Sequence, residues 1–421
     1  MNLQSLLQIS FPTPKLTPNY YSSSHQPQFF SQFSNPNCKF AEFHKRVSSK
    51  SSIVMKSFKI SGEIKCEASS EVIKDDAFYI RRCVEIAKKA IGCTSPNPMV
   101  GCVIVKDGVI VGEGFHPKAG QPHAEVFALR EAGDLAENAT AYVSLEPCNH
   151  FGRTPPCSEA LICAKVKRVV VGTVDPNPIV ASRGVAKLRD AGIEVKTGVE
   201  EEMCMKLIEA FSHRMLVGKP FLTLRYSLSV NGRLSDGLNE EAKKPGGYYS
   251  QLLQEYDGII YTSKSISGES FPTSQEPGAK QPLQIIISSP SNPVLQLPNL
   301  TPETASQVVI FTEKNTEINS KLGVETVVLE KLDLSAILDY CMEKGLCSVL
   351  LDLRGSCREL DQLVEEGVES GLLMKVVMEL LPVWDGSEES LVAGNLGKSL
   401  GRLEKLESNV CGGSVVVSGY F

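Results

Sequence analysis

Side chains that can hold a metal ion and move protons gather in one stretch of the chain. The sequence has six histidines, and three of them fall within residues 116–150: His116, His123 and His150. His123 is followed two residues later by Glu125, and Cys148 and Cys157 each come directly after a proline. One imidazole and two thiolates suit a tetrahedral zinc ion whose fourth position stays open for water.

The chemistry that this set predicts is hydrolytic deamination. Zinc lowers the pKa of water in the open position, so that hydroxide is available at neutral pH. Glu125 can then carry protons to a leaving ammonia without being a zinc ligand. Taken singly, a His-x-Glu pair or a Pro-Cys pair is more often an ordinary surface or turn feature. A purely structural zinc would normally have a fourth ligand, and we interpret Cys163 as a packed thiol because it lies well along the helix that begins at Cys157.

Composition excludes several classes of protein. The chain has 421 residues, of which 42% are hydrophobic and 22% charged, enough for two or three domains with cores of their own. A net charge of −6 argues against nucleic acid or an anionic membrane as the main partner. No apolar run approaches the roughly 20 residues needed to span a bilayer. The 13 cysteines are an odd number spread over a long chain, which favours a reducing compartment with mostly free thiols.

The N-terminal segment has the composition of an organelle transit peptide. Residues 1–62 are rich in serine and contain one acidic residue, Glu42. Their basic residues are Lys15, Lys39, Lys45, Arg46, Lys50, Lys56 and Lys59. Basic, Ser-rich and acid-poor composition is typical of transit peptides, and scarce arginine favours the plastid stroma over the mitochondrion. We expect residues 1–65 to be a disordered transit peptide, cleaved between residues 50 and 68; the alternative is a disordered tail with no targeting role.

From about residue 75 the pattern alternates between strands and helices. Helices are expected at 76–91, 123–132, 157–165, 183–191 and 200–217, and strands at 100–105, 109–114, 141–145, 168–172 and 193–196. Asp107-Gly108 is a favoured tight-turn pair between the first two strands. A second series of strands is expected at 221–228, 258–261, 284–288, 308–312, 327–329, 348–351 and 374–380, with a loop at 262–282. This predicts two α/β domains, 70–217 and 218–421, each with helices covering a sheet.

The motifs of the first domain resemble a known family. His123-Ala124-Glu125-Val126, followed by Pro147-Cys148 and Cys157, resembles the cytidine/deoxycytidylate deaminase superfamily. Most members separate the two cysteines by two residues, whereas eight lie between them here. These eight, Asn149-His150-Phe151-Gly152-Arg153-Thr154-Pro155-Pro156, closely resemble the pyrimidine deaminase of riboflavin biosynthesis. So do Asn97-Pro98-Met99-Val100-Gly101, His116, Gly120-Gln121-Pro122-His123 and Asp175-Pro176-Asn177-Pro178.

The resemblance covers about residues 75–217 and implies a fold, a cofactor and a reaction. The fold is a three-layer cytidine-deaminase-like α/β domain. The cofactor is zinc, held by His123, Cys148 and Cys157, with Glu125 as the catalytic residue. The reaction is deamination of 2,5-diamino-6-(5-phosphoribosylamino)pyrimidin-4-one to 5-amino-6-(5-phosphoribosylamino)uracil. A nucleic-acid-editing deaminase of the same superfamily would usually have a short Cys-x-x-Cys and a basic surface, and this chain has neither.

That substrate suggests binding roles for five residues. Asn97 and Asn177 are candidates for the ring, and Arg153 for the phosphate because a guanidinium binds phosphate in a two-pronged way. His116 is a candidate for ribose or phosphate, and Asp175 for ribose hydroxyls or a ring donor. All five could instead serve only in turns or loops, which Asn-Pro and Asp-Pro-Asn-Pro strings favour. Arg183-Gly184 could add phosphate contacts at a helix start, and His150 could support the metal site.

The second domain follows, in position and pattern, the dihydrofolate-reductase-like reductase that many organisms fuse to this deaminase. Four motifs of those reductases are altered. Ser229-Val230-Asn231-Gly232 lacks the carboxylate of Ser-Leu-Asp-Gly, Pro245-Gly246-Gly247-Tyr248-Tyr249 replaces a Trp-Ile-Thr-Ser segment, and residues 262–272 lack an Asp-Asn or Asp-Pro turn. Asp352-Leu353-Arg354-Gly355 stands where Glu-Gly-Gly lets backbone approach a cofactor.

These alterations predict a retained fold without reductase activity and with no cofactor site other than zinc. A structural role follows, such as a homodimer formed through the C-terminal domain, together with a separate reductase for the next step. The alternatives are a bifunctional deaminase and NADPH-dependent reductase, or a second domain that is a docking or assembly module. The small-molecule phosphoribosylaminopyrimidine is the expected substrate partner, and neither nucleic acid nor a membrane is expected as a partner.

Overall fold

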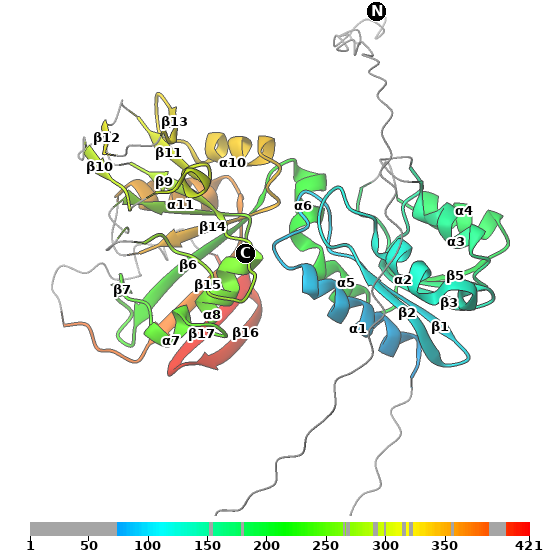
Figure 1. The fold of residues 1–421 in the computed structure, drawn as a ribbon. Coiled ribbons are helices and arrows are strands. Elements are labelled where there is room, and N and C mark those ends of the chain that lie inside the picture. Colours follow the sequence, from blue (N-terminus) through cyan, green and yellow to red (C-terminus); the bar gives the residue numbers. More distant parts are fainter. Residues whose placement is uncertain are drawn as a thin grey trace, which may run out of the picture. The chain divides into compact units, whose positions relative to one another are not determined.

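Two large β-sheets organise the described part of the chain in the computed structural model (Figure 1). The structure describes residues 74–150, 155–177, 181–263, 266, 270–288, 294–298, 300–313, 317–319, 323–354, 358–386 and 401–421. The expected transit peptide and Arg153 therefore lie outside the described residues. Those from 74 onward belong to one compact unit. No helix among them is long and apolar enough to cross a membrane.

The first sheet has five strands in the order β2-β1-β3-β4-β5. A hairpin joins β1 to β2 through Asp107 and Gly108, whose positive φ angles of 51° and 76° are those of a tight primed turn. β3 pairs antiparallel with β1, whereas β3, β4 and β5 run parallel. The strands are β1 (Gly101–Lys106), β2 (Val109–Phe115), β3 (Thr140–Leu145), β4 (Arg168–Thr173) and β5 (Glu194–Thr197).

Helices cover both faces of this sheet. Alternate residues of its strands point to opposite faces and enter two separate hydrophobic cores. Val103 and Tyr142 pack with α1 (Asp76–Ala87) and α5 (Glu201–Leu207) on one face. The neighbouring Cys102 and Val143 pack on the other face with residues of three helices. These are α2 (Ala124–Ala132), α3 (Cys157–Cys163) and α4 (Arg183–Asp190). The predicted three-layer α/β domain is confirmed.

The second sheet is larger and mixed. Its main path runs β13-β11-β9-β8-β14-β6-β15-β17-β16, and β7 pairs with β6. The strands from β13 to β15 are mutually parallel, and β17 and β16 add an antiparallel edge. The strands are β6 (Phe221–Ser229), β7 (Leu234–Ser235), β8 (Gly258–Thr262), β9 (Leu283–Ile287), β11 (Val308–Thr312), β13 (Glu325–Val328), β14 (Ser348–Leu353), β15 (Leu373–Leu381), β16 (Glu404–Cys411) and β17 (Ser414–Tyr420).

This sheet is also covered on both faces. α10 (Leu334–Glu343) and α11 (Arg358–Glu369) pack on one face, and α8 (Tyr248–Glu255) packs on the other. The remaining elements are α6 (Glu209–Val217), α7 (Glu240–Lys243), α9 (Pro302–Ala305), the short parallel pair β10 (Val294–Gln296) and β12 (Glu317–Asn319), and the 3-10 turns η1 (Lys88–Ala90) and η2 (Gly133–Ala136). The boundary predicted at residue 218 falls between the two sheets and stays a prediction.

The structure differs from the sequence expectation at several elements. The helix expected at 200–217 is two helices, α5 and α6, broken at Ile208, whose φ of −112° and ψ of 18° lie outside the helical range. The helix expected at 76–91 ends at Ala87 and continues as η1. The expected strands are all present, with ends shifted by up to two residues. Strands β7, β10, β12, β16 and β17 were not expected.

Candidate zinc deaminase site

The site lies where the loops after β3 and β4 meet the starts of α2 and α3. Leu145 at the end of β3 pairs with Thr173 at the end of β4, so the chain leaves both parallel strands at the same edge of the sheet. Ligands commonly bind at that edge of parallel strands. The loop after β3 carries Cys148, and the loop after β4 carries Asp175 and Asn177.

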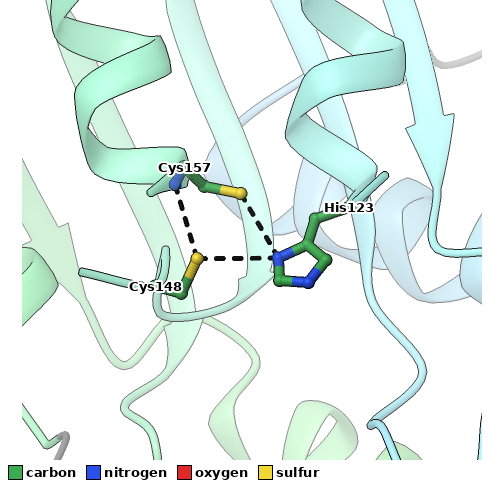
Figure 2. A group of neighbouring side chains, drawn as sticks. All are labelled: His123, Cys148 and Cys157. Carbon is green, nitrogen blue, oxygen red and sulfur yellow. Dashed lines mark hydrogen bonds between the residues drawn. The ribbon is translucent and has the colours of Figure 1, made fainter. Parts of the chain in front are cut away.

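Three side chains far apart in the sequence meet at this edge (Figure 2). The ligand atoms of His123, Cys148 and Cys157 all lie within 4.8 Å of one another. Nδ1 of His123 is 3.6 Å from Sγ of Cys148 and 3.4 Å from Sγ of Cys157. His123 precedes the first residue of α2, and Cys157 is the first residue of α3.

Close packing of α2 on β2 brings His123 to this position. Gly114 of β2 has no side chain, and a Cβ atom there would lie 2.3 Å from the carbonyl oxygen of Ala124. α2 can therefore approach β2 more closely than any larger residue at 114 would allow. The same helix buries Glu125, which is 3% exposed.

The donor set fits a dication. The backbone N–H of Cys157 donates to Sγ of Cys148 at 3.4 Å. Hydrogen bonds from Cys157 and from His123 lower the pKa of the Cys148 thiol. The nearby Cys148 sulfur, together with burial, raises the pKa of Cys157. Two sulfurs so close cannot both be thiolates without a cation, and zinc between them and an imidazole resolves the conflict.

Glu125 is buried next to these ligands. Its Oε2 atom has no hydrogen-bond partner among the described residues. Burial raises the pKa of Glu125 to about 7, and the nearby Cys148 sulfur adds to the rise. A carboxyl group with a pKa near neutrality can both accept and release a proton at the working pH.

Asn97 and His116 form a pair beside the metal ligands. Nδ2 of Asn97 lies 3.1 Å from Nε2 of His116, and Nδ1 of His116 lies 3.1 Å from the carbonyl oxygen of Pro122. Because the amide and the carbonyl fix the donor and acceptor roles, His116 carries its hydrogen on Nδ1. Its ring centroid is 5.3 Å from that of His123. His116 is 2% exposed, and burial lowers its pKa.

Of the other expected substrate residues, Asp175 and Asn177 lie in the loop after β4 at this edge of the sheet. Oδ1 of Asp175 accepts the backbone N–H of Asn177 at 2.9 Å, which is an Asx turn. Burial raises the pKa of Asp175. His150 is exposed. Roles for these residues stay predictions.

Glu146 is a residue whose importance the sequence did not reveal. It is 5% exposed, and its Oε1 accepts the backbone N–H groups of Gly184 and Val185 at 2.8 and 3.0 Å. Its Oε2 accepts those of Asp175 and Ser182 at 3.2 and 2.9 Å. The N–H groups of Ser182, Gly184 and Val185 at the start of α4 are therefore occupied. A phosphate contact at Arg183-Gly184 could not use these N–H groups, and the role expected for Arg183-Gly184 stays a prediction.

Comparisons with known proteins agree with this site. Residues 73–173 match the family model of the cytidine and deoxycytidylate deaminase zinc-binding region. The Arabidopsis thaliana riboflavin biosynthesis protein PYRD, chloroplastic, is 52% identical over 99% of both chains. Its Zea mays counterpart is 53% identical, over 86% of this chain and 91% of the maize protein.

Solved structures of bacterial RibD proteins share the whole two-domain architecture. RibD from Acinetobacter baumannii is 30% identical with a TM-score of 0.64. A deaminase/reductase from Thermotoga maritima is 27% identical with a TM-score of 0.66. Each match covers 82% of this chain and 98% of the bacterial chain.

Fold and site together define a zinc-dependent hydrolytic deaminase joined to a RibD-type reductase domain. The chain belongs to the PYRD and RibD family of riboflavin biosynthesis proteins. Zinc is its metal. It is a chloroplast protein, as its two plant relatives are, and the match to the Arabidopsis chain extends through the N-terminal segment.

Proposed function

We propose that this chain deaminates 2,5-diamino-6-(5-phosphoribosylamino)pyrimidin-4-one to 5-amino-6-(5-phosphoribosylamino)uracil. The observation that carries the proposal is the cluster of His123, Cys148 and Cys157 with the buried Glu125 beside it. The Thermotoga protein, a diaminohydroxyphosphoribosylaminopyrimidine deaminase/5-amino-6-(5-phosphoribosylamino)uracil reductase, is related over both domains and supports this substrate.

In the proposed reaction Glu125 moves the protons. His123, Cys148 and Cys157 hold zinc, which when bound makes water nucleophilic at neutral pH. Oε2 of Glu125 accepts a proton from the attacking water and delivers it to the ring amino group. A carbon–oxygen bond forms, the carbon–nitrogen bond breaks, and one water is consumed for each ammonia released.

Asn97 and His116 orient the pyrimidine ring in this proposal. The Nδ2 group of Asn97 donates to His116, which leaves the amide oxygen of Asn97 to accept an N–H of the substrate. His116 is buried and both of its ring nitrogens have protein partners. We therefore assign His116 to hold Asn97 rather than to contact ribose or phosphate itself. Asp175 and Asn177 stay candidates for ribose and ring contacts.

Arg153 is proposed to bind the phosphate. It stands in the eight-residue segment between two proposed zinc ligands, close enough in sequence to reach the far end of a phosphoribosyl group. Replacing Arg153 by alanine should raise KM much more than it lowers kcat, as expected when binding common to substrate and transition state is lost. Equal KM values for phosphorylated and dephosphorylated substrate in the unmutated protein would contradict this role.

The proposed function is tested by ammonia release from the purified chain. The diaminopyrimidine phosphate should be deaminated, a zinc chelator should abolish the activity, and added zinc should restore it. Cytidine and deoxycytidylate serve as competing substrates. Turnover of either of these, with none of the diaminopyrimidine, would overturn the proposal.

We also propose that the second domain has no reductase activity, and that a separate reductase acts next. Support comes from a group of buried charges in the middle of β6, on β15 and at the end of β14, which includes residues of two altered motifs. Arg354 stands in place of a glycine, and its Nε donates to Oδ2 of Asp352 at 2.9 Å. It also donates to Oη of Tyr249, in the segment that replaces Trp-Ile-Thr-Ser.

The rest of this buried charge cluster fills the same region. Arg225 is fully buried and donates to Asp352 at 3.2 Å and to Glu379 at 2.9 Å. Tyr248 also donates to Glu379, at 2.7 Å. These buried side chains bind one another where motif residues of the family reductases are altered in this chain, which favours a structural role for the cluster over cofactor binding. Oxidation of NADPH coupled to reduction of the deaminated product would favour the bifunctional alternative. Dimerisation through this domain stays a proposal, tested by the sedimentation of the purified chain.

A further inference from the structure

A buried carboxylate of the second domain holds a loop of the deaminase site. Residues 91–100 lie between η1 and β1 and contain no helix or strand. Their position must therefore come from contacts outside the segment, and Asn97, proposed above to orient the substrate ring, belongs to it. Besides contacts with the first domain, this loop has contacts with the second domain.

Asp257 is the centre of these contacts. It lies between α8 and β8 and is 5% exposed. Its Oδ2 accepts a hydrogen bond from the Oγ hydroxyl of Ser95 at 2.7 Å, although the two residues are 162 positions apart in the sequence. The same oxygen accepts the backbone N–H groups of Cys347 and Ser348 at 2.8 and 3.2 Å. These two bonds orient the carboxylate within its own domain, so it presents Ser95 with a fixed acceptor.

Two further contacts bring the loop against the same part of the second domain. Gly92 has a φ of 70°, and a Cβ atom there would lie 2.2 Å from the carbonyl oxygen of Gln254. The thiol of Cys347 lies 3.6 Å from the carbonyl oxygen of Pro96. The loop is therefore held on both sides of Ser95, and Asn97 follows two residues later.

We propose that Asp257 is a positioning residue for the deaminase: through Ser95 it fixes the loop that presents Asn97 to the substrate. Asp257 binds Ser95, which lies in a turn where the Asn97 N–H donates to the carbonyl oxygen of Thr94 at 2.9 Å. The side chain of Asn97 in turn contacts His116. Small displacements of a substrate-holding group cost binding and rate out of proportion to their size. This gives the second domain a role in deamination whether or not it reduces anything. The inference rests on the proposed role of Asn97.

The test compares Ser95→Ala with Ser95→Thr and with a matched control. Ser95→Ala removes the hydroxyl that reaches Asp257, and should raise KM for the diaminopyrimidine phosphate about ten- to a hundredfold, the scale of one hydrogen bond to a charged group. kcat and zinc content should stay close to normal. Ser95→Thr keeps a hydroxyl and should restore KM. Tyr420→Phe removes another bond between β17 and α6, the 2.7 Å hydrogen bond from Tyr420 to Glu209, and should leave KM unchanged.

A double-mutant cycle and amide exchange separate positioning from general loss of stability. Asp257→Ala should also raise KM, and the double variant with Ser95→Ala should be no worse than the more affected single one, because both changes break the Ser95–Asp257 hydrogen bond. Amide hydrogen exchange should accelerate in residues 92–99 of Ser95→Ala and not in Tyr420→Phe. If KM and exchange in Ser95→Ala both match the unmutated protein, the inference is overturned.

Failure of the proposed function gives a different result. The unmutated chain would then not deaminate the diaminopyrimidine phosphate at all, whatever the state of Ser95. Amide hydrogen exchange of residues 92–99 would still show whether Asp257 holds the loop. If Ser95→Ala left this exchange unchanged, the proposed hold of Asp257 on the loop would be overturned. Accelerated exchange would support it.

Discussion

The guanidinium of Arg168 binds the carboxylate of Asp76 with two parallel hydrogen bonds, 2.8 Å from Nη1 to Oδ1 and 3.0 Å from Nη2 to Oδ2. Asp76 begins α1 and Arg168 begins β4, so this pair joins a covering helix to the sheet. Lys196 and Tyr142 also donate to the same carboxylate, at 2.8 and 3.1 Å. The side chain of Asp76 is 18% exposed, which protects these bonds from full screening by solvent.

The stability of the first domain should therefore depend on pH through Asp76. The hydrogen bonds from Arg168, above all, hold the pKa of Asp76 well below its usual range. A carboxyl whose folded pKa is lowered stabilises the protein above its unfolded pKa of about 4, and the stabilisation is lost as pH falls through the folded pKa. Asp76→Asn should lower the free energy of unfolding at pH 7 by about 1–3 kcal/mol.

Urea or thermal unfolding at several pH values checks this prediction. The difference between Asp76→Asn and the unmutated chain should be largest near pH 7 and shrink below about pH 4. Asp75→Asn is the matched control, because Asp75 is exposed and caps α1 through Phe78 N–H at 2.8 Å, a role that asparagine fills equally well. A difference that is independent of pH would contradict the assignment.

Glu125→Gln tests the proton carrier. The amide keeps the size of the carboxyl group but cannot accept and release a proton, so kcat should fall by about two to four orders of magnitude. Zinc content and the thermal midpoint should be retained, because Glu125 is not among the grouped ligand atoms. Glu131→Gln, an exposed position on the same helix, should leave kcat unchanged. Near-normal turnover of Glu125→Gln would exclude the proposed mechanism.

Much of the first domain could be predicted because its signals are local. Apolar spacing predicted the helix that begins at Asp76, and the Asp107-Gly108 pair predicted the hairpin. The zinc site was predicted from residue types, since few side chains bind zinc and those of this family come with recognisable neighbours. Their meeting in space depends on strands β3 and β4 ending at one edge of the sheet, which an alternation of strands and helices already implies.

What could not be predicted depends on contacts between distant residues. Glu146 and Asp257 are acidic residues next to strands, and nothing local distinguishes them from exposed ones; their partners lie up to 39 and 162 residues away. Strand β16 is mostly exposed along its length, so it lacks the alternation that identifies a strand. The break at Ile208 falls in a run of good helix formers without glycine or proline, so sequence gave no reason to expect it.

Glu146→Gln should loosen the edge of the site. Glutamine has one carbonyl oxygen, so two of the four backbone N–H groups that Glu146 accepts would lose their acceptor. Buried N–H groups without partners are costly, and we expect a loss of about 1–3 kcal/mol in stability together with a raised KM, because Asp175 belongs to the released segment. Thermal unfolding and KM measure the two effects. Glu85→Gln, whose side chain is 68% exposed, should change neither.

Arg225→Met tests whether the buried charge cluster stabilises the second domain. Arg225 is fully buried, and its removal would leave the carboxylate of Glu379, also fully buried, without a cation. Breaking one side of a buried ion pair typically costs about 3–5 kcal/mol, because the remaining charge stays out of water. Urea unfolding should show this loss, and Arg225→Lys should recover part of it, since lysine restores the charge but not the fork of donors. The exposed Arg130→Met is the control. If Arg225→Met were as stable as this control, the charges of the cluster would contribute no stability to the second domain.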